Sequence, residues 1–293
     1  MIKPILYLNA TNNDGLTWNK KNYLLAAAER LGFDFVRDLP KDITPDFILN
    51  IEPYSRFIAG NVWTGIWEID MVLDRAEMSK TDWLASDDVF VANTAIPNHM
   101  DGLLHKTRLL FQASDPDIHK RIKEIDQVHD FVFCGSGGTG IYDERSRVLS
   151  LLRKYFSFED FPKGQAPADY IKCLNTARIQ FIRSGKTPIA NAWTAQRFFE
   201  CLAIGPVLTD WTPDLIKTGL IEGEDYLSYK NDYELLENMH KLLENSEYAN
   251  TIAENGRRKS LLYHTYDHRL ISILNVIRDH GHDIQRSFRA TLR

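Results

Sequence analysis

A buried strand runs into a glycine-rich turn at residues 130–140, DFVFCGSGGTG, and a helix is predicted to follow from about Glu144 to Phe156. Strand, turn and helix in this order form a βα unit, which is typical of a parallel sheet with helices on both faces. The turn lies at the carboxyl end of its strand, where helix N-termini direct partial positive charge into a crevice. The glycines match neither the GxGxxG fingerprint nor the P-loop, which ends in Gly-Lys-Ser/Thr. On this motif alone, an anion site and a tight turn without a ligand both remain open.

The same alternation of apolar runs and amphipathic stretches continues on both sides of this unit. Further strands are predicted at residues 5–8, 34–36, 46–51, 61–67, 88–92, 179–182 and 206–209. Further helices are predicted at residues 18–31, 169–176, 194–203, 234–244 and 249–264. The apolar pattern weakens between residues 112 and 130, so we predict two Rossmann-like domains, residues 1–127 and 128–275. For the last segment, residues 276–293, a helix that crosses back to the first domain and an exposed tail are the two alternatives.

Composition and charge exclude several classes of protein. The chain has 293 residues, of which 44% are hydrophobic and 26% charged, so a mainly disordered chain is excluded. Its 35 basic and 40 acidic residues give a net charge of -5, so a nucleic acid would have to be held by a local patch. The three cysteines, Cys134, Cys173 and Cys201, lack a Cys-x-x-Cys spacing. No signal peptide or membrane-spanning stretch is recognisable, and we expect a soluble, cytoplasmic protein.

Charged residues near two predicted helix starts indicate an anionic ligand. Arg145 and Arg147 lie in the first turn of the helix after the glycine-rich turn, where cations oppose the helix dipole unless an anion is bound. Residues 191–210, NAWTAQRFFECLAIGPVLTD, place Arg197 and Glu200 three residues apart on one helix face. A surface ion pair is one interpretation of them. The other places Arg197 on a diphosphate and Glu200 on the hydroxyls of a sugar, the two polar parts of a nucleotide sugar.

The run RFFECLAIGPVLTD, residues 197–210, resembles the R-x-F-E-x-L-A-x-G block of CgeB-like glycosyltransferases, which are relatives of glycosyltransferase group 1. Later segments are similar to that family in the same order, at residues 214–215, 223–227, 242–245, 253–257 and 264–269. The resemblance implies an α/β protein of the GT-B fold, with two Rossmann-like domains facing across a cleft. The C-terminal domain would bind the nucleotide sugar and the N-terminal domain the acceptor. In the family's E-x7-E pattern, Glu200 would bind the ribose hydroxyls, whereas Ala192 replaces the earlier glutamate, which leaves the donor sugar open.

We assign the expected site residues from these features. The residues predicted to bind the donor are Gly135, Ser136, Gly137, Arg145, Ser184, Arg197 and Glu200. The predicted catalytic carboxylates are Asp70, which follows the strand ending at Trp67, and Asp14 in the first loop. Asp70 would accept the proton of the acceptor hydroxyl or stabilise an oxocarbenium-like charge, although a helix N-cap is the alternative role.

We expect no cofactor and no required metal. His264 and His268 have a spacing of four residues, but no third ligand stands nearby and GT-B enzymes as a class need no metal for chemistry.

Together these features predict a glycosyltransferase that moves a hexosyl or pentosyl group from a nucleotide diphosphate sugar, in particular a UDP-sugar, to an acceptor hydroxyl. Retention of configuration follows from the resemblance alone. The acceptor stays open between a glycan, a protein, a small molecule and a hydroxymethylated base in DNA, as in a phage-type enzyme. A non-catalytic nucleotide-sugar binder is the alternative that Ala192 favours. A dinucleotide-dependent oxidoreductase is disfavoured by the spacing of the glycines.

Overall fold

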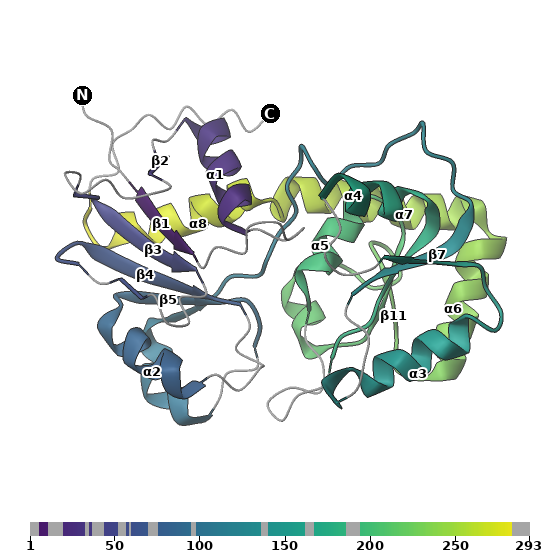
Figure 1. Ribbon diagram of the computed structural model, residues 1–293, viewed down its shortest axis with the longest axis horizontal. Coiled ribbons are helices and arrows are strands. Elements are labelled where there is room, and N and C mark those ends of the chain that lie inside the picture. Colours follow the sequence, from purple (N-terminus) through teal and green to yellow (C-terminus); the bar gives the residue numbers. More distant parts are fainter. Residues whose placement is uncertain are drawn as a thin grey trace. The chain divides into compact units, whose positions relative to one another are not determined.

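A computed structural model describes residues 6–10, 20–32, 35–36, 44–51, 57–58, 60–69, 76–94, 98–135, 140–161, 167–185 and 194–282. The chain divides into two compact units, each built around its own parallel sheet (Figure 1). Unit 1 comprises residues 1–14, 19–111 and 266–293, and unit 2 comprises residues 15–18 and 112–265.

Unit 1 contains a six-stranded parallel sheet in the order β2-β1-β3-β4-β5-β6. Its strands are β1 (Leu6–Ala10), β2 (Phe35–Val36), β3 (Phe47–Ile51), β4 (Trp63–Glu68), β5 (Asp88–Val91) and β6 (Thr107–Leu109). Its helices are α1 (Lys20–Leu31), α2 (Ala76–Ala85), the 3-10 helix η2 (Asn98–Lys106) and α8 (Tyr266–Asp279).

Strand β4 shows why the middle of this sheet is apolar on both faces. Ile66 belongs to a buried cluster that includes Trp83 of α2. The next residue, Trp67, points to the opposite face, where its ring centroid lies 6.2 Å from that of Tyr266 in α8. Because helices cover both faces, all six residues of β4 are buried.

Helix α8 returns the chain to unit 1. It packs on α1 (Figure 1). Arg30 of α1 forms a bidentate ion pair with Asp267, at 2.6 Å for the shorter contact. Arg269 donates to the carbonyl oxygen of Phe111 at 2.6 Å, and Leu270, Ile273, Leu274 and Ile277 are buried. The returning segment therefore begins at Tyr266 rather than at residue 276, because the apolar face of this helix starts with that tyrosine. Residues 283–293 lie outside the described part of the chain.

Unit 2 contains a five-stranded parallel sheet in the order β11-β10-β9-β7-β8. Its strands are β7 (His129–Cys134), β8 (Phe158–Phe161), β9 (Ala177–Ile182), β10 (Val207–Asp210) and β11 (Leu227–Tyr229). Its helices are η3 (Gly140–Tyr142), α3 (Asp143–Leu152), α4 (Pro167–Asn175), α5 (Gln196–Leu202), η4 (Pro213–Lys217), α6 (Asp232–Glu244) and α7 (Ser246–Tyr263). Helices α3 and α6 cover one face of the sheet, and α4, α5 and α7 cover the other (Figure 1).

The order of the strands in unit 2 reverses between β7 and β9. In open parallel sheets such a switch point separates the loops that leave the two strands and creates a crevice at their carboxyl ends. Here the loops begin at Gly135 and Arg183. The glycine-rich turn predicted from the sequence thus starts at the switch point.

The segment before β7 belongs to unit 2, although we predicted the domain boundary after Gln127. The buried Asn175 holds this segment, because its Oδ1 accepts from the backbone N–H of Ile122 at 2.7 Å and its carbonyl oxygen accepts from Arg121 at 2.9 Å. The boundary therefore lies after Phe111. Polar anchors of this kind leave no apolar periodicity in the sequence, which explains the difference.

Candidate functional site

Gly135 occupies the first position after β7, and another side chain would not fit there. A Cβ atom added to it would lie 2.6 Å from the ring of Phe133 and 2.7 Å from Nη1 of Arg197. Both distances are shorter than a carbon atom tolerates, so a larger residue would displace Phe133 or the end of the Arg197 side chain. The same measurement places the Arg197 guanidinium directly against the backbone at the switch point.

Arg145 lies in the first turn of α3 and is only 6% exposed. Its Nε donates to the carbonyl oxygen of Arg183 at 2.9 Å, and its guanidinium lies 4.3 Å from the ring centroid of Tyr142. Burial, together with the nearby Arg197 guanidinium, lowers the pKa of Arg145 to about 10. The guanidinium groups of Arg145 and Arg197 repel each other where water is largely excluded. A bound anion would offset this repulsion and stabilise both.

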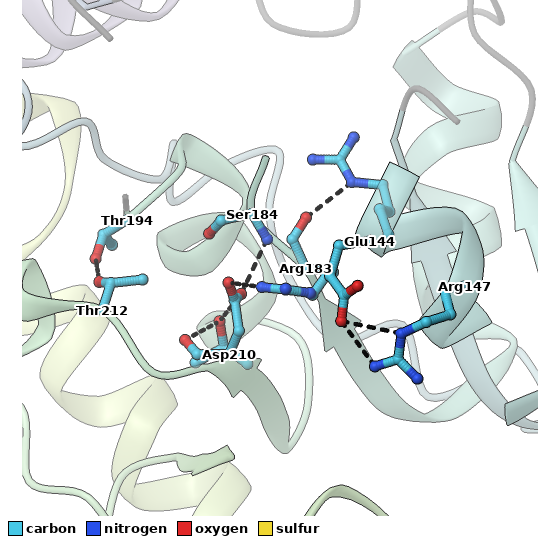
Figure 2. A network of polar contacts seen from close by, with 9 residues as sticks. Glu144, Arg147, Arg183, Ser184, Thr194, Asp210 and Thr212 are labelled. Atoms are coloured by element: carbon cyan, nitrogen blue, oxygen red, sulfur yellow. Dashed lines mark hydrogen bonds and ion pairs between the residues drawn. The ribbon is translucent and has the colours of Figure 1, made fainter. Parts of the chain in front are cut away.

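A third arginine, Arg183, follows β9 and forms an ion pair with Asp210 at the end of β10 (Figure 2). The other carboxylate oxygen of Asp210 accepts the backbone N–H of Ser184 at 2.9 Å. Burial raises the pKa of Asp210, and the Arg183 guanidinium opposes that shift. Three guanidinium groups thus share this edge with the Asp210 carboxylate, which leaves the four side chains with an excess of positive charge.

Arg147, the second arginine considered for the anion, is directed elsewhere. It forms an ion pair with Glu144 (Figure 2). It forms a second with Asp232, and both pairs are at 2.7 Å and on the surface. These hydrogen bonds raise the pKa of Arg147 and lower the pKa of Asp232. Two residues along a helix correspond to about 200°, so Arg145 and Arg147 cannot face the same side of α3.

The structure corrects the role predicted for Glu200. Its side chain is 0% exposed, and its carboxylate accepts hydrogen bonds from the Tyr170 hydroxyl at 2.7 Å and from the Gln196 amide. Nε2 of His119 lies 3.3 Å from the same carboxylate. Burial alone would raise the pKa of Glu200, but His119 and the hydrogen bonds outweigh it and hold the pKa below its usual value. The carboxylate is enclosed by protein, so we no longer assign it to the ribose hydroxyls.

Several predicted site residues lie outside the described part of the chain, namely Asp14, Asp70, Ser136 and Gly137. Among the described ones, the structure brings Gly135, Arg145, Ser184 and Arg197 to the carboxyl edge of the sheet in unit 2.

Sequence reasoning missed Arg183, Asp210, His119 and Tyr170. The first two had a signal, because Arg183 and Asp210 each directly follow a predicted strand, and such strand ends line the crevice. His119 and Tyr170 had none, since they act on Glu200 from distant parts of the sequence.

The two histidines considered for a metal are placed apart. His264 is the C-terminal cap of α7 and stacks on Phe199, with ring centroids 5.0 Å apart, whereas His268 lies in α8. The described residues contain no group of three or more His, Cys, Asp or Glu side chains that could hold a metal ion.

None of the helices in the described ranges combines the length and the apolar character that crossing a membrane requires.

A family model described as glycosyl transferase-like matches residues 118–275, more than half of the chain. The chain belongs to this family. The matched range contains the arginine cluster of Arg145, Arg183 and Arg197 as well as Glu200 and its partners. The expectation of a glycosyltransferase is thereby confirmed at the level of the family.

Solved structures share the fold of this glycosyl transferase-like protein over nearly its whole length. A sucrose-phosphate synthase from Thermosynechococcus elongatus matches with a TM-score of 0.64 and 11% identity, covering 96% of this chain and 99% of the other. HepE from Anabaena, solved with UDP and glucose, matches with a TM-score of 0.63 and 10% identity, covering 95% and 100%. AviGT4, a glycosyltransferase of avilamycin A biosynthesis, matches with a TM-score of 0.62 and 10% identity, covering 96% and 99%. The predicted GT-B class, with two parallel α/β sheets, is confirmed.

No curated protein sequence matches the chain.

Proposed function

We propose that the protein transfers a sugar from a UDP-sugar to an acceptor hydroxyl, with the diphosphate bound at the carboxyl edge of the sheet in unit 2. The observation that carries this proposal is the buried Arg145 beside Arg197 and Gly135, where the guanidinium groups lie close to the start of the glycine-rich turn. UDP as the nucleotide is supported by HepE, which was solved with UDP and with UDP-glucose.

In this proposal Arg145 and Arg197 act on the leaving group. During transfer the bond between the anomeric carbon and the β-phosphate oxygen breaks, and a bond from that carbon to the acceptor oxygen forms. Negative charge grows on the departing diphosphate, and preorganised guanidinium groups stabilise it more in the transition state than in the bound substrate. The Arg183–Asp210 pair joins the carboxyl ends of β9 and β10.

Other parts of the proposal come from the sequence. The proton of the acceptor hydroxyl goes to a carboxylate, for which Asp70 and Asp14 remain candidates. A CgeB-like specificity and retention of configuration rest on the resemblance of residues 197–210.

The test is turnover with a panel of donors. The purified protein is incubated with UDP- and GDP-sugars and with glycan, protein, small-molecule and hydroxymethylated DNA acceptors, and nucleotide release and product mass are measured. We expect UDP release with one donor and calorimetric binding of UDP. Absence of UDP binding at millimolar concentration would refute the proposal.

The same experiment addresses a second candidate, a non-catalytic binder, which the alanine at position 192 favours. Tight UDP binding without turnover on any acceptor, and without slow hydrolysis of the donor, would replace the transferase by the binder.

A further inference from the structure

Glu200 is the centre of a buried polar network in unit 2. Its partners are His119 from the segment before β7, Tyr170 of α4 and Gln196 of α5, and all four side chains are buried. An enclosed carboxylate is costly unless polar groups surround it. Here the Tyr170 hydroxyl and the Gln196 amide donate to it, and Nε2 of His119 lies 3.3 Å away. The network therefore ties these segments to one point.

A tight turn sets the direction of His119. The carbonyl oxygen of Asp115 accepts the N–H of His119 at 2.8 Å, and the Asp115 carboxylate accepts the N–H of Asp117 at 3.0 Å. Nδ1 of His119 in turn accepts the backbone N–H of Asp115 at 2.8 Å. An imidazole nitrogen that accepts carries no proton, so the ring proton is on Nε2, the atom that faces Glu200.

Helix α5 depends on this network because its own start has little local support. Its N-cap position is Ala195, which forms no side-chain capping hydrogen bond. The bond from Gln196 to Glu200 instead spans the first turn of the helix, and Tyr170 and His119 hold Glu200 from outside the helix. Arg197 lies within that turn.

Thr194, the residue before the N-cap, is also held by contacts with other segments. The Thr194 hydroxyl lies 3.0 Å from the Thr212 hydroxyl (Figure 2). The backbone N–H of Thr194 donates to the Asp214 carboxylate at 3.2 Å. The first turn of α5 is thus held from both ends by polar contacts with other segments.

We infer that His119 and Tyr170 are positioning residues, which act through Glu200 to hold the Arg197 guanidinium against Gly135. The placement of Arg197 follows from the contacts themselves, whereas its consequence for UDP rests on the proposed function. The order of action is from the turn at residues 115–119 to Glu200, from Glu200 to α5, and from α5 to Arg197. His119, Tyr170 and Glu200 can act in this way without contacting the substrate.

The experiment follows Arg197 with and without ligand. The side-chain Nε–H resonance of Arg197, assigned with Arg197→Lys, is recorded by NMR in the free protein, and UDP affinity is measured by calorimetry. His119→Phe keeps a flat ring and removes the donor, and His119→Gln restores an N–H near the position of Nε2. We expect His119→Phe to move the resonance and weaken UDP binding about tenfold, and His119→Gln to recover most of both.

Tyr170→Phe is the second variant, because it removes one donor to Glu200 without changing the ring and is expected to fold. It should move the Arg197 resonance in the same direction by a smaller amount. The matched control is Asn175→Ala. Asn175 is a buried polar residue of α4, as Tyr170 is, but it hydrogen-bonds residues 120–122 and not α5. It should lower the melting temperature and leave the resonance and the UDP affinity unchanged.

The outcomes separate the two proposals. If His119→Phe and Tyr170→Phe move the Arg197 resonance no more than Asn175→Ala does, the positioning role is overturned. If the resonance moves as expected but the wild-type protein does not bind UDP, the positioning role stands and the proposed function fails. If His119→Phe does not fold, the comparison of Tyr170→Phe with Asn175→Ala decides.

Discussion

The two edges of the sheet in unit 2 each gather three arginines, but in different surroundings. At the carboxyl edge, Arg145 is 6% exposed and stacks on aromatic rings beside Arg197 and Gly135. At the amino edge, Arg121, Arg178 and Arg257 line a cavity of about 430 Å³.

Two of the three arginines at the amino edge, Arg178 and Arg257, are more exposed than Arg145 and already have carboxylate partners. The side chains of Arg178 and Arg257 are 40% and 41% exposed, and each has a carboxylate nearby, Asp130 at 3.8 Å and Glu254 at 2.9 Å. Exposed pairs of this kind contribute little, since water and salt screen them. Under the proposed function, the number of cations does not identify the anion site, because both edges have three. The carboxyl edge differs in the burial of Arg145 and in the approach of Arg197 to Gly135.

The largest expected effect separates the two edges by ligand binding. Arg145→Gln should weaken UDP binding by about 10- to 100-fold, because a hydrogen bond from a charged group contributes about 1.5 to 3 kcal/mol. Arg178→Gln at the amino edge should change the affinity less than twofold. Calorimetry measures both. Equal losses for the two variants would mean that unspecific charge attraction, and not the carboxyl edge, binds the nucleotide.

A glycine at each edge gives a matched pair for stability. Gly135→Ala should lower the free energy of unfolding by about 1 to 3 kcal/mol, since the new Cβ would overlap Phe133 and Arg197. Gly205→Ala at the amino edge should cost less than about 1 kcal/mol, because its nearest neighbour, Gln180, would be 3.4 Å away. Urea unfolding provides the values. The close approach of Arg197 to the backbone would be refuted by a Gly135→Ala variant as stable as the wild type.

A buried and an exposed glutamate extend the comparison to pH. The pKa of Glu200 is lowered in the folded state, so its stabilising contribution is complete above the unfolded pKa of about 4.3 and is lost as the pH falls through the lower folded pKa. Glu200→Gln should therefore cost about 1 to 2 kcal/mol at pH 7, with a difference from the wild type that shrinks below about pH 4.

The control for that pH dependence is Glu254→Gln, since the Glu254 side chain is 64% exposed. Its unfolding should follow the wild-type curve within about 0.5 kcal/mol at every pH. Parallel pH curves for wild type and Glu200→Gln would show that the Glu200 carboxylate is not held in its ionised form.

The smallest expected effect concerns metal removal. If Arg145 and Arg197 neutralise the diphosphate, transfer needs no divalent cation, and EDTA should leave the rate of UDP release unchanged. The rate is compared with and without added magnesium at constant ionic strength. If EDTA abolishes activity and magnesium restores it, a metal ion and not the guanidinium groups neutralises the charge of the diphosphate.

Local patterns in the sequence predicted most of the βα units of both sheets and the cations Arg145 and Arg197 near helix starts, but not the strands β6, β8 and β11 or helix α2. They could do so because apolar periodicity, turn residues and helix spacing act over a few residues. They also determined that Arg145 and Arg147 point to different sides of one helix, but not which of them faces the crevice.

Only the tertiary structure decided the environment of Glu200 and the boundary after Phe111. Spacing placed Arg197 and Glu200 on one helix face, yet Tyr170 and His119, which are 30 and 81 positions away in the chain, enclose the carboxylate. Likewise, Asn175 attaches residues 120–122 to unit 2 from more than 50 positions away. The side chains around a buried polar group come from distant segments, and the energy that places them depends on which donors finally surround it. Apolar periodicity in the sequence does not indicate which distant residues will be those partners.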